Sequence, residues 1–167
     1  CPECNDPFDL SSHSRVRPPE AEIASVVDQI RFSEEEGFCG HLHICHLSTM
    51  GALEAVEGAR SAGRRISCAV TPHHLLLSEE DAKERSLWAK MNPPLRSEAE
   101  RRALFAATLA GRIDWIETDH APHTLADKEG GASGIPGFSG LLLAVKALID
   151  GGIDPALLSE LLGGRVK

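Results

Sequence analysis

Histidine and aspartate residues recur at three places in the chain, each time directly after a short apolar run. His46 follows HLHIC, a histidine pair at 73 and 74 follows RISCAVTP, and Asp119 follows IDWIET. Imidazole and carboxylate groups are common zinc ligands in proteins, and they also serve as general acids and bases. Because the end of a strand requires no titratable group, three such endings in succession indicate a site that performs chemistry.

The apolar runs predict β-strands, and helical patterns lie between them. Strands are expected at 41–48, 65–71 and 113–118. Ser97 with Glu100 favours a capping box, and Asp154 followed by Pro155 favours a helix start. Helices are predicted between Pro18 and Gly37, Thr49 and Gly63, and Ser97 and Gly111, within SEEDAKERS, and at about 138–150 and 154–162.

Strands that alternate with helices at this spacing predict the α/β class with a parallel sheet, because each parallel crossover needs a helix. Periodicity alone leaves both an open sheet and a (β/α) barrel as alternatives. In either fold, ligands gather beyond the carboxyl ends of the strands, where the histidines and Asp119 follow. A complete barrel requires about 250 residues and eight strands, so three strands would form part of one.

Composition narrows the class of protein. The 167 residues are 42% hydrophobic and 25% charged, which is typical of a soluble globular protein. We expect a cytoplasmic protein, because no apolar run approaches the roughly 20 residues that cross a bilayer. The net charge of −8 argues against a nucleic-acid partner, since that binding needs a basic surface.

The motifs HICHLST, VTPHHLLL, KMNPPLRSEAERRALF, IETDHAPHTLADKE and SGIPG resemble those of the dihydroorotases, members of the amidohydrolase superfamily. The resemblance covers about residues 13–162, and TPHHL, MNPPLR and TDHAPH together carry it. Related allantoinases and hydantoinases more typically show PHYL-like and SDHSP-like sequences. The resemblance implies part of a TIM-like (β/α)8 barrel, about strands 6–8, so that residues 1–167 form a partial domain without its N-terminal half.

The resemblance also implies a zinc site with one or two ions. His46 corresponds to a histidine ligand of the metal at the end of strand six. Asp119 corresponds to the strand-eight aspartate that binds the metal and acts as the catalytic general base. The family's remaining ligands, a His-x-His pair, an Asp or carboxylated Lys and a further His, have no counterpart that we can place here.

Four further residues correspond to substrate contacts of the family. Asn92 of MNPPLR and His123 of DHAPH match side chains that bind the substrate. Ser133 and Gly134 fall where a loop backbone touches the ring, although the family often has Phe or a similar residue at the position of Ser133. Instead of binding a substrate, Asn92 could be a turn residue, and His123 could form a hydrogen bond within a loop.

The function implied is reversible conversion of N-carbamoyl-L-aspartate and L-dihydroorotate in pyrimidine biosynthesis. Zinc would activate water and polarise the ring carbonyl, while Asp119 would transfer the proton. The protein is expected to form either a homodimer or an assembly with other enzymes of the pathway. A non-catalytic homologue with a structural role, or an allantoinase- or hydantoinase-type cyclic amidase, remains as an alternative.

The other histidines are expected to support the site. His41 and His43 have the His-x-His spelling, but they lie within a strand where the family has no such pair. His13 is expected in a loop. His73, His74 and His120 are expected to shape the site and hydrogen-bond within it, without binding the metal.

Five cysteines in a scattered, odd-numbered arrangement favour reduced thiols. Cys45 and Cys68 are expected as small core residues inside strands. Cys1 and Cys4 form a lone CxxC, which is weak evidence for a structural zinc. The chain begins at Cys1 and stops after a helix-like run, so we expect a piece of a longer protein. Alone, this piece is expected to be inactive and to aggregate or self-associate.

Overall fold

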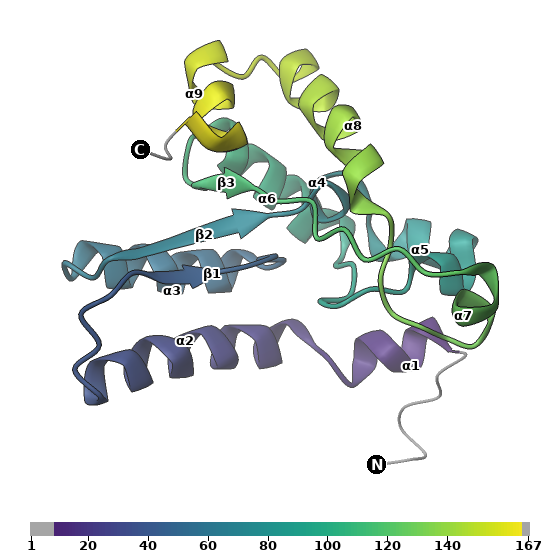
Figure 1. Ribbon diagram of the computed structural model, residues 1–167, viewed down its shortest axis with the longest axis horizontal. Helices are drawn as coiled ribbons and strands as arrows, with labels where there is room; N and C mark the ends of the chain where they lie inside the picture. Colours follow the sequence, from purple (N-terminus) through teal and green to yellow (C-terminus); the bar gives the residue numbers. More distant parts are fainter. Residues whose placement is uncertain (1–8, 165–167) are drawn as a thin grey trace.

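The computed structural model describes residues 9–164 (Figure 1). Three strands, β1 (Leu42–Ile44), β2 (Ile66–Val70) and β3 (Trp115–Ile116), form one sheet in the order β1-β2-β3. Both pairings are parallel. The α/β class and the parallel sheet predicted from the sequence are therefore confirmed, and the three carboxyl ends lie at one edge.

Helices connect and flank the strands. They are α1 (Leu10–Arg15), α2 (Pro19–Glu35), α3 (Met50–Ser61), α4 (Pro72–Leu76), α5 (Glu79–Arg85), α6 (Glu98–Leu109), α7 (Leu125–Glu129), α8 (Gly137–Asp150) and α9 (Pro155–Ser159), with the helical turns η2 (Ser86–Ala89) and η3 (Glu160–Gly164). Figure 1 shows α4, α5 and α7 beyond the carboxyl ends of the strands. Among the described residues, no helix is both long and apolar enough to cross a membrane.

The hydrophobic core lies between the sheet and the helices. Ile66, Cys68 and Val70 alternate along β2 and contribute buried side chains to one apolar cluster. Helices supply most of the other members, including Leu53 from α3 and Leu104 from α6, and β3 supplies Ile116. Alternation places Ser67 and Ala69 on the opposite face of β2, where they are also buried. The sheet is thus covered by helices on one face, and its other face carries more polar side chains.

All three strands are shorter than predicted, and the sequence analysis missed three helices, α1, α4 and α7. The runs at 41–48 and 113–118 are extended only over β1 and β3. The backbone leaves the β region at His46 and Asp119, where φ is 40° and 42°, and this interrupts each extended run, although the Leu47 N–H still donates to the carbonyl oxygen of Ala69 beyond His46. Of these helices, α4 begins where the Thr71 hydroxyl accepts from the His74 backbone N–H.

The predicted helix starts are correct, with one difference in detail. Asp154 accepts hydrogen bonds from the backbone at the start of α9. Ser97 likewise accepts from the backbone N–H of Glu100, but the Glu100 carboxylate does not return to Ser97. It accepts from the N–H of Met50, 2.9 Å away, and so joins the start of α6 to the start of α3.

Candidate functional site

His46 and Asp119 follow the two outer strands of the sheet, and both have left-handed backbone conformations. Among the described residues, they are the only non-glycine residues with positive φ, at 40° and 42°. Such conformations cost of order 1–3 kcal/mol for a residue with a Cβ, and they persist where surrounding structure holds them. These conformations change the direction of the two side chains from the one that they would have in a continued strand. They do so at the edge of the sheet where the sequence predicts the metal site.

Glu117 links the ends of the outer strands. It follows β3, and its carboxylate Oε1 accepts a hydrogen bond from the backbone N–H of His46, which follows β1. This contact spans the width of the sheet and fixes the backbone at His46. Sequence reasoning missed Glu117, although its position two residues before Asp119 is the signal that could have identified it.

His73 is buried at the start of α4 and has an unusual environment. Its side chain is 3% exposed, and neither ring nitrogen has a hydrogen-bond partner within the described part of the chain. Burial, and then the neighbouring His74, lower the pKa of His73 to about 3, while Asp119 and His46 also act on it electrostatically. The expectation that His73 hydrogen-bonds within the site is therefore wrong for the described part of the chain.

His74 and His120 do form the supporting contacts expected of them. His74 Nε2 donates to the carbonyl oxygen of Pro93, 3.0 Å away, so Nδ1 accepts from the Thr71 hydroxyl at 2.7 Å. Burial lowers the pKa of His74 to about 3, which keeps the ring neutral. His120 Nδ1 accepts from the backbone N–H of Phe138 at 3.2 Å. These rings join the strand-end segments to MNPPLR and to α8.

Asn92 and His46 line the same cleft, which has a volume of about 520 Å³ and is also lined by Arg96. His13 supports the segment that carries Asn92, because its Nε2 donates to the carbonyl oxygen of Met91 at 2.9 Å. His13 lies in α1 and is buried, so its expected place in a loop is wrong. The structure thus brings two of the predicted site residues together and adds an unforeseen support.

His123, Ser133 and Gly134 meet between two loops. His123 Nε2 donates to the carbonyl oxygen of Ser133 at 2.8 Å. Gly134 has a φ of 132°, and a Cβ there would lie 2.8 Å from the Ala121 carbonyl oxygen and from His123 Nε2. Glycine is therefore required for this close approach. The loop hydrogen bond considered for His123 is present, and it does not exclude contact with a substrate because His123 is exposed.

Lys128 holds the loop that contains Ser133 and Gly134. Its buried ammonium group donates to the carbonyl oxygens of Ala132 and Gly134, each at 3.0 Å, and to that of Lys90 at 3.1 Å. Burial, and then the nearby Lys90, lower the pKa of Lys128. This role of Lys128 was not predicted from the sequence, since a lysine within a polar helix usually faces solvent.

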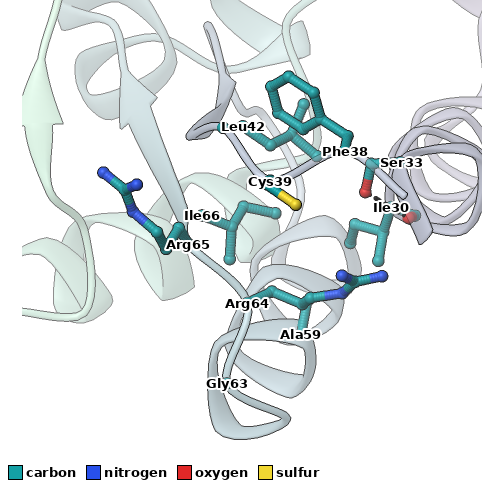
Figure 2. Close-up of a pocket in the computed structure, with 11 residues that line it drawn as sticks. Ile30, Ser33, Phe38, Cys39, Leu42, Ala59, Gly63, Arg64, Arg65 and Ile66 are labelled. Carbon is teal, nitrogen blue, oxygen red and sulfur yellow. Dashed lines mark hydrogen bonds between the residues drawn. The ribbon is translucent and has the colours of Figure 1, made fainter. Parts of the chain in front are cut away.

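Two other clefts differ in position and character. One, of about 620 Å³, has a mainly apolar lining that includes His73, Met91 and Gly137. The other, of about 200 Å³, lies at the amino ends of β1 and β2, where Leu42 and Ile66 line it (Figure 2). The cleft in Figure 2 contains none of the predicted site residues, so the chemistry-bearing groups belong to the opposite edge of the sheet.

The cysteines divide into three cases. Cys68 is buried in the core, as expected. Cys45 is exposed, so its expected place in the core is wrong. Its pKa is raised by local burial and by the nearby carboxylates of Glu117 and Asp119. Cys1 and Cys4 lie outside the described residues.

Comparison of the sequence with known proteins gives two kinds of result. No protein-family model matches the chain. It is 47% identical over 110 residues to the dihydroorotase of Lactiplantibacillus plantarum, covering 66% of this chain and 25% of that protein. It is 44% identical over 132 residues to the dihydroorotase of a Geobacillus strain, covering 78% of this chain and 30% of that protein. The chain therefore spans less than a third of the length of these relatives.

Comparison of the fold identifies amidohydrolase barrels. L-hydantoinase from Arthrobacter aurescens matches with a TM-score of 0.85 and 23% identity, over 93% of this chain and 36% of that one. D-hydantoinase from Thermus sp. matches with a TM-score of 0.80 and 26% identity, over 95% of this chain and 36% of that one. Dihydroorotase from Saccharomyces cerevisiae matches with a TM-score of 0.71 and 16% identity, over 83% of this chain and 40% of that one. The chain has the fold of part of such a barrel, as the sequence predicted.

Proposed function

This chain is homologous to the dihydroorotases and has the fold of part of the amidohydrolase barrel, and on that basis we propose that it supplies part of the active site of a metal-dependent cyclic amidohydrolase. The observation that carries the proposal is the placement of His46 and Asp119. Both follow parallel strands at one edge of the sheet, and both are held in left-handed backbone conformations. Catalytic groups of barrel enzymes lie at this edge.

The residues present fit a zinc site. His46 and Asp119 would contribute a nitrogen and an oxygen ligand, the donor types that zinc accepts in catalytic centres. His73 lies within electrostatic reach of both, and its buried, unpaired ring nitrogens indicate that this edge accommodates a polar group that the described residues do not supply. The number of ions, one or two, depends on ligands beyond those identified in this chain.

A ring amide is a poor electrophile, and the chain's residues would assist its hydrolysis in defined ways. When bound, zinc lowers the pKa of water and polarises the ring carbonyl. The Asp119 carboxylate would accept the proton of the attacking water and deliver it to the departing ring nitrogen. Asn92 and His123 would orient the substrate, while the backbone of Ser133 and Gly134 would contact its ring.

Our proposed substrates are L-dihydroorotate and N-carbamoyl-L-aspartate, interconverted in cytoplasmic pyrimidine biosynthesis. The level of identity to proteins named dihydroorotase favours this substrate pair. A homodimer or an assembly with other enzymes of the pathway would complete the functional unit. The second candidate is hydrolysis of a hydantoin-type ring, which is supported by the close fold similarity to hydantoinases.

The test uses the natural protein that includes residues 1–167. Zinc-dependent hydrolysis of L-dihydroorotate and of hydantoin would be measured for the parent, for Asp119→Asn and for Asp150→Asn. We expect Asp119→Asn to lower kcat for L-dihydroorotate by about 10²–10⁴-fold, the usual contribution of a general base. Asp150→Asn is the matched control, because Asp150 is exposed and forms an ion pair with Lys146 one turn earlier on α8.

Each outcome decides between the candidates. Activity on hydantoin alone would replace the dihydroorotase proposal with the hydantoinase one. A folded, zinc-supplied parent without activity on either ring would favour a non-catalytic homologue. Equal activity of the two variants would remove Asp119 from the catalytic role.

A further inference from the structure

A second group of metal-ligand side chains lies beside the proposed active site and is not used by it. His43 comes from β1, Cys45 follows β1, and Glu117 follows β3. One ligand atom from each residue lies within 4.8 Å of the other two. A search of the described part of the chain finds no other such cluster of three.

The alternation of side chains along the strands explains why these residues meet. His43 and Cys45 are two positions apart and therefore point to the same face of the sheet. The ring of His43 packs against Trp115 of β3, with 4.9 Å between ring centroids. Glu117, two positions beyond Trp115, lies on this same face, opposite the hydrophobic core. The arrangement thus follows from parallel pairing and needs no separate loop.

His43 is oriented as a metal-binding histidine usually is. Its Nδ1 lies 2.8 Å from the hydroxyl of Ser67, and that hydroxyl lies 2.6 Å from Nε2 of His41. The hydroxyl can accept from one ring and donate to the other. His43 Nε2 is left facing Glu117, with 3.9 Å to Oε2. A metal-binding histidine typically engages a hydrogen-bond partner through its second ring nitrogen in this way.

The Glu117 carboxylate contacts both of the other ligand side chains. Oε1 accepts from the backbone N–H of His46, which leaves Oε2 directed toward His43. Bonds of about 2.0–2.3 Å to a central ion would draw the three ligand atoms somewhat closer together. Only a small closure of side chains is required, since His43 and Glu117 are both partly exposed and Cys45 is exposed.

We propose that His43, Cys45 and Glu117 bind a borderline divalent ion such as Zn²⁺, at a site separate from that of His46 and Asp119. Imidazole nitrogen, thiolate sulfur and carboxylate oxygen together favour zinc over magnesium or calcium, which prefer oxygen ligands alone. Water or a residue from outside the described chain completes the tetrahedral coordination. On binding, the Cys45 thiol loses its proton to solvent and the sulfur coordinates the ion.

Cobalt substitution tests the proposal, because Co²⁺ bound to a thiolate gives a sulfur-to-metal charge-transfer absorption in the near ultraviolet. The natural protein that includes residues 1–167 is used in a Cys1→Ser/Cys4→Ser background, which removes the CxxC. We expect the absorption in this parent and in the Cys39→Ser control, since Cys39 is exposed and lines the cleft of Figure 2, which contains no residue of the cluster. Cys45→Ser should abolish it, and Ser67→Ala should weaken Co²⁺ affinity about 10–100-fold.

A second measurement does not depend on the folding of the Cys45→Ser variant. Alkylation of Cys45 by iodoacetamide, followed by mass spectrometry, should be slowed by Zn²⁺ in the parent. It should not be slowed in His43→Ala. Absence of the charge-transfer absorption from the parent, its persistence in Cys45→Ser, or alkylation that Zn²⁺ leaves unchanged would each overturn the proposal.

The outcome is separable from that of the proposed hydrolase activity. Asp119→Asn should lose hydrolysis while keeping the thiolate-to-cobalt absorption. Loss of the absorption in Asp119→Asn would instead mean that there is a single shared site, which contradicts the separate site proposed here. A parent without hydrolase activity can still show the absorption, so failure of one proposal does not imply failure of the other.

Discussion

The ammonium group of Lys128 donates a hydrogen bond to the carbonyl oxygen of Lys90, 3.1 Å away. The same group also binds two carbonyl oxygens of the loop at 132–134, and the backbone N–H of Gly134 donates to Lys90 at 2.9 Å. One buried side chain therefore joins the proposed substrate loop to the segment that leads to Asn92.

Replacing Lys128 with Met should loosen this loop. The substitution leaves buried carbonyl oxygens without their donor, and we expect the free energy of unfolding to fall by about 1–3 kcal/mol. Hydrogen exchange at the Gly134 N–H should become faster. Lys146→Met is the control, because Lys146 is exposed and its ion pair contributes little. Unchanged exchange at Gly134 would show that Lys128 does not hold the loop.

Arg96 and Glu22 form a buried ion pair that supports the loop after β1. Their side chains are 6% and 12% exposed, and Arg96 Nη2 lies 2.9 Å from Glu22 Oε2. Arg96→Met should lower the free energy of unfolding by about 3–5 kcal/mol, because it leaves the Glu22 charge buried and unpaired. Urea unfolding measures the loss.

The double variant Glu22→Gln/Arg96→Met separates the pair from its surroundings. Removing both charges should recover part of the stability lost in Arg96→Met. If the double variant is instead less stable than Arg96→Met by the full cost of Glu22→Gln alone, the two side chains act independently. The energetic coupling inferred from their contact would then be wrong.

His74 should make stability depend on pH in a defined window. Its pKa is about 3 in the folded protein, against an ordinary value of 6.5. Above pH 6.5 the ring is neutral in both states. As pH falls from 6.5 toward 3, His74 binds a proton in the unfolded chain but stays neutral in the folded protein. The free energy of unfolding therefore falls by about 1.4 kcal/mol per pH unit.

The contribution of His74 is isolated by comparison with His74→Gln. Unfolding free energies measured across this window should decline less steeply with falling pH in the variant than in the parent. His73 remains in both proteins, so the part of its pKa shift that burial causes is common to the two slopes, and only the part that His74 causes is lost in the variant. Equal slopes, or an NMR titration midpoint of His74 near 6.5, would contradict the buried, neutral state.

Gly137 marks a close approach between α8 and the loop before Asp119. A Cβ at this position would lie 1.8 Å from the carbonyl oxygen of Thr118. Gly137→Ala should therefore displace α8 and lower the free energy of unfolding by about 1–3 kcal/mol. Thermal unfolding and the zinc-dependent activity should both show the effect.

Gly58→Ala is the matched control for that substitution. Gly58 lies within α3, and a Cβ there would meet nothing within 4 Å. Because alanine favours a helix over glycine by about 1 kcal/mol, this variant should be slightly more stable than the parent. If both alanine variants behaved alike, the close approach at Gly137 would not be a packing constraint.

The amino-acid sequence determined the class of fold and the edge at which the polar residues gather. Alternating apolar runs and helical patterns are local features, and a parallel sheet follows from them because each crossover needs a helix. His46 and Asp119 follow the strands in the sequence itself, so their common edge was predictable. The resemblance to dihydroorotases added the barrel and the expected roles, and the comparisons support that relationship.

Only the tertiary structure decided which distant residues meet. The contacts of Lys128 with Lys90, and of Glu117 with His46, join residues 38 and 71 positions apart. No local pattern encodes such pairs, because they depend on how whole elements pack. The burial of His73 and the exposure of Cys45 are likewise properties of the assembled sheet. Side-chain type indicated the chemistry available, whereas packing determined which groups are paired, which are buried and which remain open to a ligand.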